Sequence, residues 1–177
     1  HRLTGVERFR IDVERETLLR FLAEQRGFLL HTLKDLDEEQ ATRRTTKSVL
    51  HLAGIVKHVS LSEREWVRFI EKGGPDHPDY DDPAAHERHE EGFRLVGDET
   101  LESTLEHYAQ TARRTEEFVR ALPDLEVGHE LPPAPWFPAN TVWSARDVLL
   151  MLIRETAQHC GHADIIRESL DGQKTMG

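Results

Sequence analysis

Three side chains of metal-ligating type lie close together near the C-terminal end of the chain, in the segment Glu155-Thr-Ala-Gln-His159-Cys-Gly-His162. At ~100° per residue on a helix, Glu155, His159 and His162 fall within about 60° of one another. The apolar residues Leu152 and Ile166 share this stripe, so the face is expected to point into the protein. An unpaired inward-facing imidazole or carboxylate costs on the order of several kcal/mol. A divalent metal would satisfy all three groups at once, so the spacing predicts a metal site.

His58 is the candidate that would close this site from another helix. It lies between Ile55 and Val59 in an apolar-rich stretch, where a lone histidine is more often a buried core residue than a ligand. The i,i+4 spacing of Glu155 and His159 favours the metal site, because it brings a carboxylate oxygen and a ring nitrogen within reach of one ion. The alternative is that these two residues form a solvated pair on the helix surface.

The composition excludes several classes of partner. The 177-residue chain has a net charge of -10, whereas nucleic acids and anionic membranes attract basic surfaces, so neither is an expected partner. The apolar run around 149–153 is far shorter than the ~20 residues that span a bilayer, and no signal-peptide pattern follows the N-terminus. A single cysteine excludes an internal disulfide and suits a reducing compartment, so we expect a cytoplasmic protein.

Four long segments have helical periodicity, and none has sustained strand-like alternation. We expect helices over about 12–36, 47–72, 98–122 and 144–170. At the start of the last segment, Ser144 and Asp147 have the spacing of a capping box. With 37% hydrophobic residues, helices of this length predict an all-α fold, a four-helix bundle, in a single domain over residues 1–177.

Two long connections separate these helices. The first, residues 73–97, is acidic and contains three histidines: His77, His86 and His89. The second, residues 123–143, contains or leads to three large aromatic residues: Trp136, Phe137 and Trp143. Connections of this length in a compact domain are usually functional or disordered. We expect the aromatic connection to pack over something, and we expect the surface histidines His77 and His89 to be dispensable for metal binding.

Three segments of the chain resemble the DinB-like superfamily. They are Glu14-Arg-Glu-Thr-Leu-Leu-Arg-Phe-Leu, Lys57-His58-Val and Arg154-Glu-Thr-Ala-Gln-His-Cys-Gly-His-Ala-Asp-Ile-Ile-Arg-Glu-Ser-Leu-Asp-Gly172. The similarity spans nearly the whole chain and is closest to an actinobacterial branch of unknown function, in the same group as mycothiol-dependent maleylpyruvate isomerase. This resemblance implies a four-helix bundle in up-down-down-up order, here with two long loops, and a homodimer as a further expectation.

The resemblance also implies a ligand set. Members of the superfamily bind a divalent metal, usually zinc or nickel, through a histidine of the second helix and a Glu-x-x-x-His or His-x-x-x-His pair of the fourth. His58, Glu155 and His159 match these positions. His162 falls where many relatives have glutamine, so it is either a fourth ligand or a donor to the site. Cys160 lies about 100° from His159 on the helix, so it is expected to point towards a neighbouring helix rather than the ion, as a small buried hydrophobic residue.

Three protein ligands leave an open coordination position, as in catalytic metal sites. In characterised relatives the activated group is the thiol of mycothiol or bacillithiol. The resemblance therefore implies a metal-dependent thiol S-transferase or isomerase that acts on a small electrophile, with mycothiol as the candidate co-substrate. Trp136, Phe137 and Trp143 would shape its substrate pocket. The catalytic residues and those that bind the thiol are not identifiable from the sequence.

Two other interpretations remain open at this stage. The chain could be a non-catalytic, stress-related metal-binding bundle, which His162 would favour if it closed the open coordination position. It could also catalyse metal-assisted hydrolysis, with a nearby glutamate as the base. Glu63 lies five residues after His58 and on the wrong side of its helix for that role, so hydrolysis ranks last.

Overall fold

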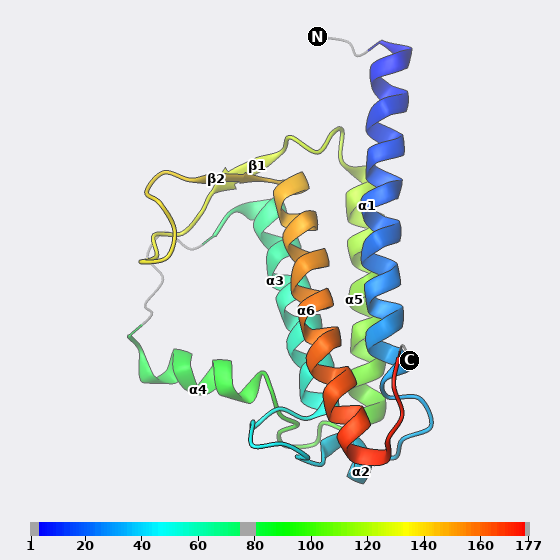
Figure 1. Ribbon diagram of the computed structural model, residues 1–177. Helices are drawn as coiled ribbons and strands as arrows, with labels where there is room; N and C mark the ends of the chain where they lie inside the picture. Colours follow the sequence, from blue (N-terminus) through cyan, green and yellow to red (C-terminus); the bar gives the residue numbers. More distant parts are fainter. Residues whose placement is uncertain (1–3, 75–80, 176–177) are drawn as a thin grey trace.

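The computed structural model describes residues 4–74 and 81–175 of the chain (Figure 1). The long helices are α1 (Gly5–His31), α3 (Leu52–Lys72), α5 (Leu101–Ala121) and α6 (Ala145–Asp171). The shorter elements between them are α2 (Glu38–Thr42), α4 (Pro83–Glu91), β1 (Gly128–Glu130) and β2 (Val142–Ser144). The predicted all-α class is thus confirmed as a mostly helical chain, to which the structure adds a small two-stranded sheet.

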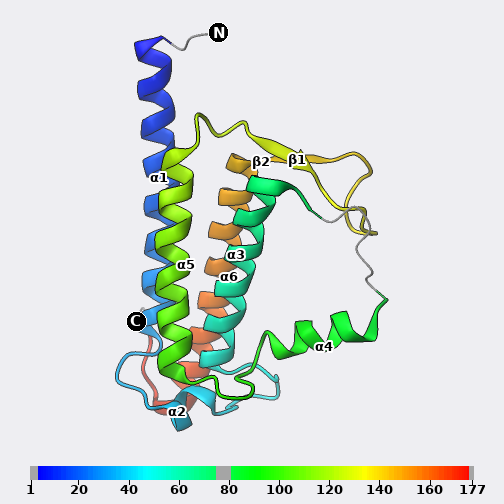
Figure 2. The ribbon, with the colours of Figure 1, turned by 180° about the vertical axis from the view of Figure 1, so that it is seen from behind.

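The four long helices lie side by side in both ribbon views (Figures 1 and 2). α1 packs chiefly on α6, and α3 packs on both α5 and α6. With increasing residue number, α1 and α6 run down the page in Figure 1, while α3 and α5 run up it. The neighbouring helices α3 and α6 are therefore antiparallel, so a residue in the first half of α3 can meet residues near the middle of α6.

The last helix begins and ends where the sequence predicts. Ser144 is its N-cap: the Ser144 hydroxyl accepts a hydrogen bond from the Asp147 backbone N–H, and the Asp147 carboxylate accepts one from the Ser144 N–H. Gly172 ends the helix with φ 80°, a left-handed value that glycine adopts without a steric penalty. These two ends fix where Glu155 and His159 lie along α6.

Two helix starts differ from the prediction. α1 begins at Gly5 rather than near residue 12, because Thr4 provides an N-cap farther upstream. α3 begins at Leu52 rather than near residue 47, because the Nδ1 atom of His51 accepts a hydrogen bond from the N–H of Gly54 and caps the helix there. Histidine is an unusual N-cap, so the hydrophobic pattern alone did not reveal this boundary.

The two long connections contain regular structure that was not predicted. α4 lies within the first, and β1 and β2 pair antiparallel in the second, with Gly128 opposite Ser144. Each strand has only three residues, so no alternating pattern can stand out in the sequence. Within the described residues, no helix combines the length and the apolar character that crossing a bilayer requires.

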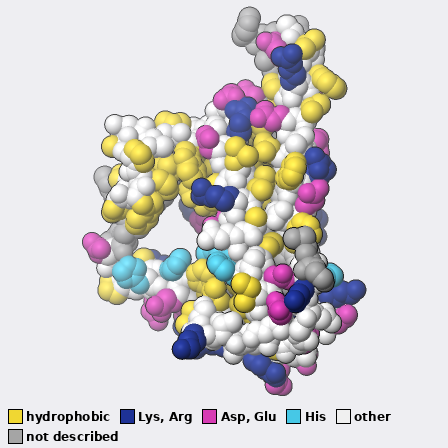
Figure 3. Space-filling model, viewed as in Figure 1, with side chains coloured by type: hydrophobic (Ala, Val, Ile, Leu, Met, Phe, Trp, Pro, Cys, Tyr) yellow, Lys and Arg dark blue, Asp and Glu magenta, His cyan; other side chains and the backbone are white. Residues whose placement is uncertain are grey.

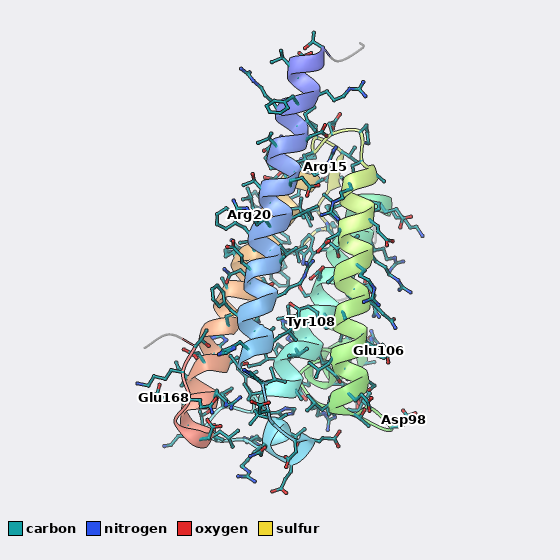
Figure 4. All side chains as sticks on the ribbon, turned by 90° about the vertical axis from the view of Figure 1, so that its right-hand side faces the viewer. Arg15, Arg20, Asp98, Glu106, Tyr108 and Glu168 are labelled. Atoms are coloured by element: carbon teal, nitrogen blue, oxygen red, sulfur yellow. The ribbon has the colours of Figure 1, made fainter. Side chains whose placement is uncertain are left out.

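The core consists of two apolar clusters at different levels along the long helices. On α1, Leu22 belongs to the first cluster and Leu29 to the second. Between these two leucines, the buried guanidinium of Arg26 donates to the buried carboxylate of Glu63 on α3, with Nε 3.1 Å from Oε2. Tyr108, which is part of the second cluster, lies between α5 and α1 (Figure 4). A polar layer therefore separates the two clusters.

Candidate metal centre

Three of the four predicted ligands converge between α3 and α6. His58 comes from α3, and Glu155 and His159 come from adjacent turns of α6. One potential ligand atom from each of these residues lies within 4.8 Å of the other two. The Nε2 atoms of His58 and His159 lie 3.1 Å and 3.2 Å from the same carboxylate oxygen, Oε1 of Glu155. The structure thus brings together, from distant parts of the chain, the three residues that match the resemblance.

The packing of the two helices explains this position. On α3, Ile55 and Val59 on either side of His58 are fully or almost fully buried, and on α6 Leu152 is buried as well. The three polar side chains lie at the edge of this core rather than inside it: 17% of the His58 side chain is exposed, 28% of that of Glu155 and 12% of that of His159. The inward-facing stripe predicted from the sequence is therefore partly exposed to solvent.

The electrostatics of the cluster suit a cation. Hydrogen bonds from His159 and then from His58 hold the pKa of the Glu155 carboxyl well below its usual range. Glu155 is therefore a carboxylate at neutral pH. In the observed arrangement both imidazoles present Nε2 to one carboxylate oxygen. Two ring nitrogens and a carboxylate oxygen form a donor set typical of zinc and of other divalent transition metals, so these residues fit such an ion.

His162, the fourth predicted ligand, lies outside the cluster formed by the other three. Its Nδ1 atom lies 3.3 Å from Nδ1 of His159, on the opposite side of that ring from the Nε2 atom that faces Glu155. Among the described residues, the group of converging ligand atoms contains His58, Glu155 and His159 and does not include His162. A hydrogen bond at the second nitrogen of a ligating histidine fixes the orientation of its ring, and His162 is placed to provide one.

Two residues of the first long connection lie beside the site, and the sequence did not point to either of these contacts. The Phe93 ring stacks on the His58 ring, with centroids 3.9 Å apart and planes at 15°. The exposed ring of His89 on α4 meets His58 edge-on, with centroids 6.3 Å apart. The dispensability of His89 for metal binding stays a prediction, now for a residue beside the site. His77 lies outside the described residues.

We call β1, β2 and the segment that joins them the hairpin region. The space-filling view shows a hollow bordered by α4, the hairpin region and the long helices (Figure 3). Histidine side chains gather along one edge of this hollow, and apolar side chains cover the wall formed by the hairpin region. In that region Trp143 stacks on Trp66 of α3, with centroids 5.1 Å apart, and Phe137 packs edge-on against Trp143. The expectation that the aromatic connection packs over something is confirmed, and its partner is the later half of α3.

Two other candidate groups do not face the site. Glu63 is buried and paired with Arg26, so it is not placed to act as a base beside His58. Cys160 points to α1, where its thiol donates to the backbone carbonyl oxygen of Gln25 at 3.2 Å. The prediction that Cys160 faces a neighbouring helix rather than the ion is confirmed, although the residue is only half-buried.

Comparison with known proteins adds a family and a fold. The sequence profile of a family described as mycothiol-S-transferase matches residues 17–172. No curated protein matches the chain. A crystal structure of a conserved protein from Enterococcus faecalis is similar, with a TM-score of 0.67 and 12% sequence identity, over 89% of this chain and 97% of that one. At this identity the likeness shows the fold alone. The family match covers α3 and α6, the two helices that carry the site.

Proposed function

Since the chain belongs to the mycothiol S-transferase family, within the DinB-like group, we propose that it is a divalent-metal-dependent thiol S-transferase. Its co-substrates would be mycothiol and a small electrophile, and its metal zinc or nickel. The observation that carries this proposal is the convergence of His58, Glu155 and His159, with both imidazole Nε2 atoms directed at one carboxylate oxygen.

The proposed roles follow from the geometry. His58 and His159 would bind the ion through Nε2, and Glu155 would bind it through Oε1 while contributing a negative charge. A divalent cation in such a site lowers the pKa of a bound thiol, which makes a thiolate available at neutral pH. His162 would act on the ring of His159 by accepting or donating a hydrogen bond at Nδ1, so that Nε2 stays directed at the ion.

The reaction that this arrangement supports is transfer of a thiol sulfur to carbon. A bond forms between the thiol sulfur and the electrophilic carbon, the S–H bond breaks, and the proton passes to solvent. The leaving group departs with the electrons of its bond to carbon. In an addition to a double bond, the atom at the other end of that bond takes up the electron pair and a proton instead. The partly open edge of the cluster and the hollow beside it would admit both reactants, with the aromatic side chains of the hairpin region covering the electrophile.

The placement of His162 bears on the non-catalytic alternative. A metal-binding protein without activity would be favoured if His162 filled the remaining coordination position. Its contact with the far side of the His159 ring instead supports three protein ligands and an open position. We also assign the four long helices, as one domain over residues 1–177, to a DinB-like four-helix bundle in up-down-down-up order. The contact between α3 and α6 and their opposite directions in Figure 1 support this assignment.

Metal content measured by elemental mass spectrometry tests the proposal. The untagged wild-type protein is expected to carry about one zinc or nickel per chain, and the variant His58→Ala/His159→Ala is expected to carry none. His107→Ala, at an exposed position of α5, is the matched control and should keep the metal. A metal-free wild-type protein that also ignores added zinc and nickel would refute the site.

Activity is the second part of the same test. Mycothiol and a chromogenic aryl halide should react faster with the metal-loaded wild-type protein than with the double variant. If the protein binds metal at these residues but accelerates no reaction of mycothiol with any electrophile tested, the non-catalytic alternative holds.

A further inference from the structure

The segment that follows α4 packs against α3 at the candidate ligand His58 and at the turn of the helix that precedes it. We call Phe93 and Arg94 of this segment the clamp, because three separate contacts hold them against α3. The contacts involve Gly54, Lys57 and His58, which share one side of α3. Gly54 and His58 are four residues apart, so they lie one above the other on the helix.

The first contact is a close approach of two backbones. A Cβ atom placed on Gly54 would lie 1.9 Å from the carbonyl oxygen of Phe93 and 2.6 Å from its carbonyl carbon. Any larger residue at position 54 would therefore push the Phe93 backbone away from α3. Glycine at this position lets the clamp sit directly on the helix, one turn before His58.

The second contact is made by Lys57, whose side chain is largely buried. Its ammonium group donates to the backbone carbonyl oxygen of Arg94 at 3.0 Å and to the Glu99 carboxylate at 2.7 Å. Glu99 in turn accepts a hydrogen bond from the backbone N–H of Val96. Lys57 thus ties both ends of the short connection between Arg94 and Glu99 to α3, which explains why a lysine precedes the histidine in the sequence.

The third contact reaches the candidate ligand itself. The half-buried Phe93 ring lies flat on the His58 imidazole, with centroids 3.9 Å apart and planes at 15°. Stacking of this kind restricts rotation of the imidazole about its bond to Cβ while leaving the ring edge free. The Nε2 atom on that edge is the one that faces Glu155. An aliphatic side chain could fill the same space, but it would not impose a flat orientation.

We propose that Phe93 is a positioning residue for His58, held in place by Gly54 and Lys57, and that the clamp sets the affinity of the site for its metal. This inference rests on the proposed function, because it takes His58 to be a ligand. It predicts that metal affinity depends on a residue that is not itself a ligand. The Phe93 ring stacks on His58 and also lies near the His159 ring, with centroids 6.2 Å apart and planes at 52°. Groups that orient a metal ligand typically change affinity by about 10- to 100-fold when they are removed.

Zinc affinity measured by competition with a chromogenic chelator is the test. Phe93→Leu is expected to raise the Kd for Zn²⁺ about tenfold or more, and Phe93→Tyr, which keeps a flat ring, should stay close to the wild-type value. Phe118→Leu is the matched control, since Phe118 packs on the first apolar cluster away from the site. Melting temperatures of the metal-free variants check that each one folds.

A second readout follows the His58 ring without any metal. In the metal-free wild-type protein, the stacked Phe93 ring should shift the His58 ring protons upfield in NMR spectra. Phe93→Leu should abolish that shift, and Lys57→Met, which loosens the clamp without altering the stack directly, should reduce it and weaken zinc binding. Lys57→Met also keeps the proposal testable if Phe93→Leu does not fold.

The outcomes separate the two proposals. Zinc binding by the wild-type protein that His58→Ala abolishes, together with an unchanged Kd in Phe93→Leu and Lys57→Met, would overturn the clamp alone. A wild-type protein that binds neither zinc nor nickel would overturn the proposed function, and the role of the clamp with it.

Discussion

Cys160 follows the candidate ligand His159 directly, yet it lies in a different environment. Burial raises the pKa of its thiol to about 11. The thiol is therefore protonated at neutral pH and its nucleophilic form is scarce, which argues against Cys160 as the sulfur nucleophile of the proposed transfer.

The pH dependence of alkylation tests this assignment. Iodoacetamide should modify the folded protein slowly at pH 8, with a rate that rises roughly tenfold per pH unit until the pH approaches the thiol pKa. The urea-unfolded chain, in which the thiol is exposed, should react much faster at the same pH and serves as the control. Mass spectrometry counts the modified fraction. Rapid modification of the folded protein at pH 7 would contradict a half-buried, protonated thiol.

At the scale of single residues, helical spacing was enough to indicate part of the candidate site. The i,i+4 relation of Glu155 and His159 depends only on the geometry of one helix, and a neighbouring helix had to supply His58. Phe93 was missed for a physical reason. Its contact with His58 depends on a backbone approach to Gly54, and neither residue belongs to a periodic pattern. His162 shares the stripe but not the cluster, because it lies two turns after Glu155, about 10 Å farther along the helix axis. Its Nδ1 atom meets Nδ1 of His159 instead.

At the scale of elements, the buried pair Arg26–Glu63 fastens α1 to α3. Only 6% of the Arg26 side chain and 1% of the Glu63 side chain are exposed. Removing Arg26 leaves the Glu63 charge buried without this counter-charge, which typically costs about 3–5 kcal/mol. Removing Glu63 costs less, because Arg26 also lies 3.4 Å from the Glu116 carboxylate.

Urea denaturation of metal-free protein should show the full loss for Arg26→Met and a smaller loss for Glu63→Gln, in which Arg26 keeps its contact with Glu116. The double variant Arg26→Met/Glu63→Gln should be less destabilised than the sum of the two single changes, because neither charge is then left unpaired. Additive losses would mean that the two side chains stabilise the protein independently and that the pair does not hold the helices together.

The elements themselves were predictable to different degrees. α6 could be placed at both ends, because Ser144, Asp147 and Gly172 are strong local signals. The start of α3 could not, since its cap is a histidine ring. β1 and β2 could not be seen at all, because a strand of three residues is defined by its partner rather than by its own sequence.

At the scale of the whole molecule, α1 carries a line of exposed apolar side chains on its outer surface. Five of them lie along the helix: Val6, Phe9, Val13, Phe21 and Phe28. The Phe9 side chain is 68% exposed, near the end of α1 that extends beyond the other helices (Figure 1). Exposed apolar side chains gathered on one face can mark an interaction site, so the homodimer stays a prediction with a defined surface.

Sedimentation velocity tests this surface. The wild-type protein should sediment as a dimer, and Phe9→Glu/Phe21→Glu should shift it toward the monomer, because a buried interface does not accept two unpaired carboxylates. Val49→Glu introduces the same chemical change at an apolar position that is 66% exposed but lies off α1, and it should leave the dimer intact. A wild-type monomer at all concentrations would remove the dimer prediction.

The arrangement of the whole molecule could be predicted only in outline. The number of long helices follows from periodicity, and their order was implied by the resemblance rather than by any pattern in the chain. The docking of the hairpin region could not be predicted, because the stack of Trp143 on Trp66 joins residues far apart in sequence. The same holds for the contact of Lys57 with Arg94, which is mediated by a backbone carbonyl that carries no sequence signal.

The division of the core into two apolar clusters has a consequence for the local unfolding of the protein. The buried side chains of each cluster pack mainly among themselves, and a polar layer lies between the two clusters. We therefore expect the two ends of the molecule to unfold locally and independently of each other. The candidate ligands Glu155 and His159 lie between the two clusters on α6. Leu152 of the first cluster precedes them, and Ala163 of the second follows. An ion held there would join the two halves, so that loading it would slow amide hydrogen exchange at both ends of the molecule at once.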